Sequence, residues 1–114
     1  MNNTDNEIEK SKPHVAVELI QYVPQSVVSK SIIHKPTGNI RIVAFDKGEE
    51  LTSKTSPFDI YAQIIDGRAE IIIDGKPFTL GKGQVIIMPA HTTSIMKAIE
   101  KFKIQFTIIK SGYE

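Results

Sequence analysis

The side chains of this sequence that could do chemistry are few, and Lys54 and His91 lead them. A lysine amine that is partly desolvated has a lowered pKa and can act as a base, a Schiff-base nucleophile or an anchor for an anion. The more ordinary alternative for Lys54 is a stem along apolar surface and an ammonium that reaches water. His91 could be a metal ligand, a general base or a hydrogen-bond donor to a ligand, or a loop histidine beside Pro89.

Hydroxyl and carboxyl groups offer weaker alternatives. Three hydroxyls lie close together, at Thr92, Thr93 and Ser94, but no histidine and carboxylate are spaced to activate a serine. A Ser-His-Asp hydrolase is therefore not favoured. Asp59 and Glu70 could form an acid–base pair only if both side chains pointed to the same face of a sheet. Strand alternation instead predicts that at least one of them faces solvent.

Composition excludes several classes of function. The 114 residues suffice for one domain with a single hydrophobic core. The absence of cysteine excludes disulfides, thiolate metal sites and cysteine nucleophiles. A net charge of +1 gives no reason to expect nucleic acid or a membrane as a partner, and no apolar run is long enough to span a bilayer. Without a signal-peptide pattern, we expect a cytoplasmic protein. We also expect the protein to use no cofactor.

The elements that would position these side chains are predicted to be strands. Asp66-Gly67 and Asp74-Gly75 are short hairpin signals, and Gly81 to Gly83 is a further turn. Between Phe102 and Ile108 apolar residues alternate with Lys, Gln and Thr, which is typical of a strand with one buried and one wet face. Short strands with glycine-rich turns predict an all-β sandwich or barrel.

The N-terminal part has a different composition from the rest. Residues 1–13 are polar and are predicted to be a disordered or loosely attached arm, whereas residues 14–114 form the folded domain. Val15 to Tyr22 could be a strand or one helical turn. We assign no function to His14, at the end of the arm, or to His34 beside a Pro-Gly turn.

The remaining basic side chains are scattered over different predicted strands. This distribution is more typical of a solvated surface than of a nucleic-acid patch. The residues concerned are Arg41, Arg68, Lys97 and Lys103.

The order and spacing of glycines and a proline between residues 27 and 110 resemble the small single-domain cupins. The first cupin motif, G-x5-H-x-H-x3,4-E-x6-G, is matched in its frame by Gly48 and Gly67. The second, G-x5-P-x-G-x2-H-x3-N, is matched by Gly83 and Pro89. The resemblance implies an all-β, single-domain cupin-type jelly-roll β-barrel.

At the positions where cupins bind metal, this sequence carries other residues. The resemblance places Lys54 and Ser56 at the two histidine positions of the first motif, Ile60 at its carboxylate position and Ser94 at the histidine position of the second. Hydroxyls are poor ligands for transition metals, isoleucine has no donor atom, and an ammonium repels a cation. We therefore expect no metal at the usual cupin site.

The leading hypothesis is a metal-free barrel that binds a small organic molecule and lacks cupin metal catalysis. Gln63 faces inward only if a bulge shifts its strand. The residues expected to line the pocket are Lys54, Ser56, Ile60, Gln63, His91, Ser94 and Met96.

Two other hypotheses remain open. One is a metal-dependent cupin enzyme, oxygenase- or isomerase-like, with a relocated site around His91 and either Glu70 or Gln63, or with Lys54 as a reactive amine. The other follows from the resemblance, which implies a homodimer with the N-terminal or C-terminal strands at the interface. The sequence identifies neither a substrate nor a catalytic residue.

Overall fold

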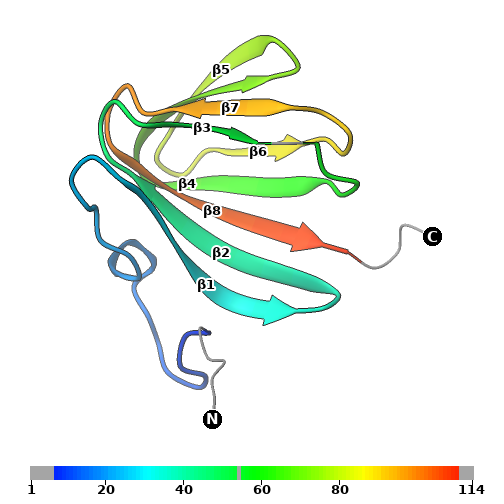
Figure 1. The fold of residues 1–114 in the computed structure, drawn as a ribbon. Coiled ribbons are helices and arrows are strands. Elements are labelled where there is room, and N and C mark those ends of the chain that lie inside the picture. Colours follow the sequence, from blue (N-terminus) through cyan, green and yellow to red (C-terminus); the bar gives the residue numbers. More distant parts are fainter. Residues whose placement is uncertain (1–6, 54, 111–114) are drawn as a thin grey trace.

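The chain folds into one strongly curled antiparallel sheet, as the computed structural model shows for residues 7–53 and 55–110 (Figure 1). This confirms the predicted all-β class. Apart from the short 3-10 helix η1 (Ala16–Glu18), the elements found in the described residues are strands. They are β1 (Val27–Lys35), β2 (Gly38–Phe45), β3 (Glu50–Ser53), β4 (Ile60–Ile73), β5 (Lys76–Gly81), β6 (Val85–Met88), β7 (Ser94–Lys97) and β8 (Phe102–Ile109).

The long strand β4 organises the sheet. Its first half pairs with β8 and β6, and β8 continues through β2 to β1. Its second half pairs with β5 and with β7, which carries β3 at its far side. Because one strand belongs to both halves, the sheet curls into a half-barrel with a concave and a convex face (Figure 1).

The predicted hairpin at Asp66-Gly67 is wrong, because β4 runs straight through these two residues. Ile64 pairs with Ile104 and Asp66 pairs with Lys103, so Ile65 is an extra residue on β4. Gly67 follows with φ +75°. A β-bulge and a hairpin turn both use a glycine at positive φ, and here the glycine serves a bulge that bends the strand from one half of the sheet into the other.

The other predicted turns are confirmed. Asp74 (φ 50°) and Gly75 (φ 83°) join β4 to β5 in a two-residue hairpin, and Gly83 (φ 87°) lies in the turn before β6. Both central residues of the first turn have positive φ, which is the backbone geometry that matches the twist of paired strands.

The concave face holds the main hydrophobic core. Every second residue of β4 and of β8 points into it, including Ala62, Ile64, Phe102 and Ile104, all at most 1% exposed. The rings of Phe45 and Phe102 stack there with centroids 4.4 Å apart. This packing of alternate residues follows directly from the two-residue period of a strand.

The convex face of β1 and β2 is covered by residues 19–22. Ile20, Ile42 and Ala44 form a second buried cluster on that side. The Tyr22 hydroxyl donates a hydrogen bond of 2.7 Å to Asp66 Oδ2. Burial, with this bond, raises the pKa of Tyr22 far above its ordinary value, so the phenol stays protonated as a donor.

Lys103 differs from the expectation of a solvated cation. It is 5% exposed, and its Nζ donates a hydrogen bond of 2.6 Å to the carbonyl oxygen of Val17. The same ammonium lies 4.8 Å from the centre of the Tyr22 ring. The segment that covers the convex face thus supplies both a carbonyl and an aromatic ring to this cation, which compensates for its removal from water.

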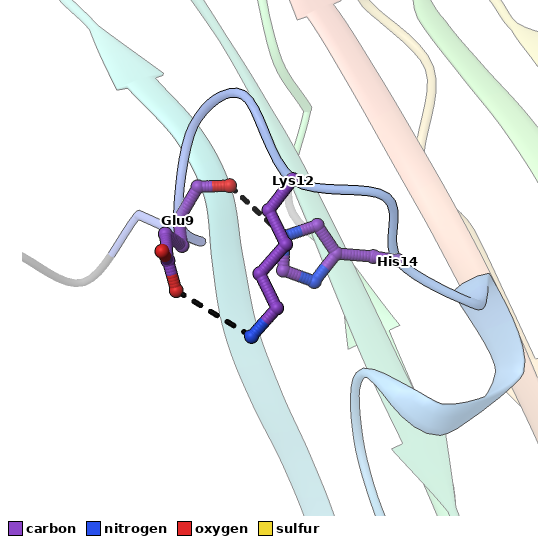
Figure 2. A network of polar contacts seen from close by, with 3 residues as sticks. All are labelled: Glu9, Lys12 and His14. Atoms are coloured by element: carbon purple, nitrogen blue, oxygen red, sulfur yellow. Dashed lines mark hydrogen bonds and ion pairs between the residues drawn. The ribbon is translucent and has the colours of Figure 1, made fainter.

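The described part of the N-terminal arm lies beside β1. The Ile8 amide donates to the Ile32 carbonyl at 3.2 Å. Further along, Lys12 forms an ion pair with Glu9, and a ring nitrogen of His14 is hydrogen-bonded to the Glu9 carbonyl (Figure 2). These exposed contacts hold a compact turn between residues 9 and 14. No helix among the described residues has the length and apolar character needed to cross a membrane.

We predict that Gly67→Ala destabilises the protein far more than Gly48→Ala. A Cβ at Gly67 would lie 2.0 Å from the Lys101 carbonyl oxygen, whereas a Cβ at Gly48 (φ +88°) would meet nothing within 4 Å. Both variants carry the backbone cost of alanine at positive φ, about 1–2 kcal/mol, and only the first adds a clash with backbone. Urea unfolding of both variants measures the difference. Equal losses would show that the close approach at the bulge is unimportant.

Candidate functional site

The barrel is filled with buried side chains at one end and is open to solvent at the other. Along β2, burial changes from complete in Ile42 to Phe45 to partial in Gly38 to Arg41. Strand β8 shows the same trend, because its first three residues are fully buried and its last two are not. The partly buried ends of these two strands lie side by side in the sheet. The concave face therefore opens into a cavity at this end.

The cavity has a volume of about 360 Å³. This is within the range of pockets that bind small molecules. One wall comes from β1, β2, β8, the start of β4 and its partner β6, and the other from β3 and β7. The lining residues are Ser31, His34, Asn39, Arg41, Leu51, Ser53, Ser56, Ile60, Met88, Met96, Phe106 and Ile108.

The polar side chains of β1 and β2 are grouped on one part of the cavity lining. Ser31 and Arg41 are direct partners across β1 and β2, as are His34 and Asn39, so these four side chains form one polar wall. The apolar residues come from β4, β6, β7 and β8, with Leu51 from β3. A ligand in this cavity would meet one cation on the polar wall and mostly hydrocarbon elsewhere, together with the hydroxyls of Ser53 and Ser56.

Two groups on the polar wall have unused hydrogen-bonding capacity. The side chain of Arg41 forms no hydrogen bond or ion pair with another described residue. The Oδ1 atom of Asn39 is buried and accepts no hydrogen bond within residues 7–53 and 55–110. Buried polar atoms are normally satisfied, so a group without a partner in a cavity indicates a place for a ligand or an ordered water.

Three of the seven residues predicted to form the pocket line this cavity. They are Ser56, in the loop before β4, Ile60 at the start of β4, and Met96 on β7. Lys54 lies outside the described residues.

The other predicted pocket residues lie elsewhere. Gln63 pairs with Val85 and Gln105 on the convex side of β4, because the bulge comes after it in the chain and leaves its orientation unchanged. The His91 side chain is exposed to solvent, and its backbone has a φ of 65°. Its backbone amide donates a hydrogen bond of 2.7 Å to the Ser56 carbonyl oxygen. Ser94 is 5% exposed opposite Ser53 and does not border the cavity.

The described cavity residues do not fit a metal ion. A transition metal needs several imidazole, thiolate or carboxylate donors that converge. The lining offers one imidazole, that of His34, and no carboxylate, together with the guanidinium of Arg41. Across residues 7–53 and 55–110, no three His, Asp or Glu side chains come close enough to hold an ion. Glu70 and Gln63 are seven residues apart on β4, about 20 Å, so the two cannot both belong to one site.

Arg41 is the residue that the sequence analysis assigned to the surface and that the structure places in the cavity. Its position has the same parity as Val43 and Phe45, which both point into the core. The signal was therefore present in the sequence, but Ile40, Ile42 and Ala44 form an equally apolar face. Which face of β2 lines the barrel is decided by its pairing with β1 and β8.

Comparison with solved structures supports the architecture. A conserved protein of unknown function from Streptococcus pyogenes matches with a TM-score of 0.85 and 28% identity, and the alignment covers 96% of both chains. A cupin 2 conserved barrel domain protein from Leptotrichia buccalis is 33% identical with a TM-score of 0.78, over 82% of this chain but 46% of the longer one. A cupin superfamily protein from Desulfitobacterium hafniense matches with a TM-score of 0.82 at 21% identity, over 95% and 98% of the chains.

No protein-family model matches the sequence, and no curated protein is significantly similar to it. The class is therefore defined by structure: an all-β antiparallel jelly roll that forms a curled half-barrel. More particularly, the chain has the small cupin conserved-barrel fold, which confirms the resemblance seen in its glycines and proline.

We predict that the arm is released from the cavity rim in acid. The Glu7 carboxylate accepts a hydrogen bond from the His34 amide at 2.8 Å and pairs with Lys35 at 3.1 Å. These contacts hold the pKa of Glu7 below its ordinary value of 4.5. The attachment is thus complete above about pH 4.5 and is lost as the pH falls through the lower folded pKa.

Amide exchange of Ile8, whose N–H bonds to β1, reports this release. Its protection factor, corrected for intrinsic exchange, should fall in acid and should already be low in Glu7→Gln at neutral pH. Glu9→Gln is the matched control, because Glu9 pairs only within the arm and with exposed Lys12. Equal Ile8 protection in Glu7→Gln and in the unmodified protein would contradict the prediction.

Proposed function

We propose that this protein binds a small organic molecule in the concave cavity of the barrel and does so without a metal. The observation that carries the proposal is the cavity of about 360 Å³, which has one polar wall and an otherwise mostly apolar lining. Binding sites for small molecules are mostly apolar hollows with a few placed polar groups. No catalytic step is proposed, because the His34 ring forms no hydrogen bond with a serine hydroxyl in the described lining.

We predict that a matching ligand stabilises the protein and that blocking the cavity abolishes the effect. A ligand at 100 times its dissociation constant raises the free energy of unfolding by about 2.7 kcal/mol. Thermal unfolding with a panel of carboxylic acids, amides and sugars measures this. Ser53→Trp places an indole in the cavity, whereas Thr52→Trp, on the neighbouring exposed position of β3, is the matched control.

The outcome of this test is decisive for the cavity. A compound that stabilises the unmodified protein and Thr52→Trp, but not Ser53→Trp, binds where we propose. A compound that stabilises all three binds elsewhere on the molecule. If no compound of the panel stabilises the protein, the proposed function is wrong.

We further propose that the protein forms a homodimer through the convex face of β4, β6 and β8. Four large apolar side chains on these strands are exposed. Val85 is exposed at 48%, Tyr61 at 40%, Ile87 at 59% and Ile109 at 61%, and the last three lie close together. These three border one shallow depression, since Tyr61 pairs with Ile87 across β4 and β6. Apolar side chains that gather on one face of a small sheet are typical of surfaces that pair with a second copy. Strand β8 is the C-terminal strand, in agreement with the expectation from the sequence.

We predict that Ile87→Lys converts the dimer to a monomer, because it places two ammonium groups in the apolar contact. Light scattering at about 100 μM protein measures the mass, and a dimer of moderate affinity is fully formed at this concentration. The matched control is Ile99→Lys, which changes an equally exposed isoleucine (64%) in the loop before β8. A monomeric mass for the unmodified protein would refute the proposal.

A further inference from the structure

The polar wall of the cavity offers a cation that no described residue neutralises. Arg41 and His34 are the basic residues among the described lining, and that lining contains no aspartate or glutamate. A guanidinium held in a partly enclosed, mostly apolar hollow has lost part of its hydration and attracts an anion strongly. Its planar fork of donors matches a carboxylate through two parallel hydrogen bonds. The cavity therefore favours a ligand that carries a carboxylate.

Beside this cation lies an acceptor that a carboxylate cannot satisfy. The orphaned Oδ1 of Asn39 needs a donor, and a ligand hydroxyl or amino group would provide one. Asn39 and Arg41 are two residues apart on β2 and face the same side, so their Cα atoms are about 7 Å apart. Both side chains reach into the same hollow. A donor next to the carboxylate can meet Asn39 while the carboxylate meets Arg41.

The rest of the described lining is mostly apolar, with the hydroxyls of Ser53 and Ser56 as its polar groups. Ile60, Met88, Met96, Phe106 and Ile108 supply hydrocarbon and two thioethers. Met88 and Met96 are unbranched and adapt to the shape of an apolar group. The part of the ligand that points away from Arg41 is therefore apolar.

From these three features we infer that the ligand is a small organic acid with a hydroxyl or amino group next to its carboxylate and an apolar remainder. Arg41 binds the carboxylate, Asn39 accepts a hydrogen bond from the neighbouring donor, and the apolar side chains of β4, β6, β7 and β8 cover the remainder. The inference rests on the proposed function, because it names the chemical class of the molecule that the cavity binds.

Four related compounds separate the two polar contacts. Mandelate has both the carboxylate and the hydroxyl, phenylacetate lacks the hydroxyl, mandelamide lacks the charge, and phenylacetamide lacks both. The same four forms of an aliphatic acid repeat the test: 2-hydroxy-4-methylpentanoate, 4-methylpentanoate and the amides of these two acids. Titration calorimetry gives the affinities. We expect each 2-hydroxy acid to bind with a dissociation constant of about 1 mM or tighter, and at least about tenfold more tightly than its amide or its deoxy form.

Two variants assign each preference to its residue. Arg41→Met should abolish the preference for acid over amide and leave the preference for the hydroxyl. Asn39→Leu should abolish the preference for the hydroxyl and leave the preference for acid over amide. Arg68→Met removes the exposed arginine of β4 and is the matched control, with both preferences kept. Melting temperatures establish that the variants fold, which we expect for Arg41→Met because its side chain has no described partner to lose.

Several results would overturn the inference. An amide that binds the unmodified protein as tightly as its acid removes the role of Arg41, and an acid preference that survives in Arg41→Met does the same. A hydroxyl preference that persists in Asn39→Leu removes the role of Asn39. If none of the eight compounds binds while another compound stabilises the protein but not Ser53→Trp, the cavity function stands and the inferred class is wrong. If nothing binds at all, both proposals are wrong.

Discussion

The close approach of Gly67 to the backbone of Lys101 and Phe102 allows one strand to serve both halves of the sheet. A Cβ at this position would lie 2.9 Å from the Phe102 Cα, so only glycine lets β4 and β8 stay paired through the bend. The extra residue Ile65 then points to the convex side and packs with Ile20 and Ile42. Curvature of the sheet, closure of the core and covering of the convex face all follow from this bulge.

The curvature also divides the barrel into a core and a cavity. At the closed end, large side chains such as Phe45, Phe102 and Ile71 meet across the concave face and exclude solvent. At the open end the facing residues are smaller or polar, among them Ser31, Ser53 and Ser56, and they leave the space unfilled. The cavity therefore exists because side-chain volume falls along the strands towards one end of the barrel.

The cupin frame and the side chains of this cavity have separate roles. The frame consists of backbone features, namely glycines at positive φ and a proline, and it specifies turns and a bulge whatever the pocket contains. The described pocket instead presents a guanidinium, an amide, hydroxyls and a single imidazole where a metal site would need several imidazoles and carboxylates. These side chains suit the anionic ligand that we propose better than a metal ion.

The sequence by itself determined the strand class, the turn at Asp74-Gly75 and the alternation of β8, because these depend on residues that are neighbours in the chain. It also determined that Ser56 and Ile60 have poor donor atoms. The tertiary structure alone decided that Gly67 forms a bulge and that Arg41 faces the cavity. In both cases the chain permits two local solutions, and pairing with β8, whose residues lie more than thirty positions away, selects one of them.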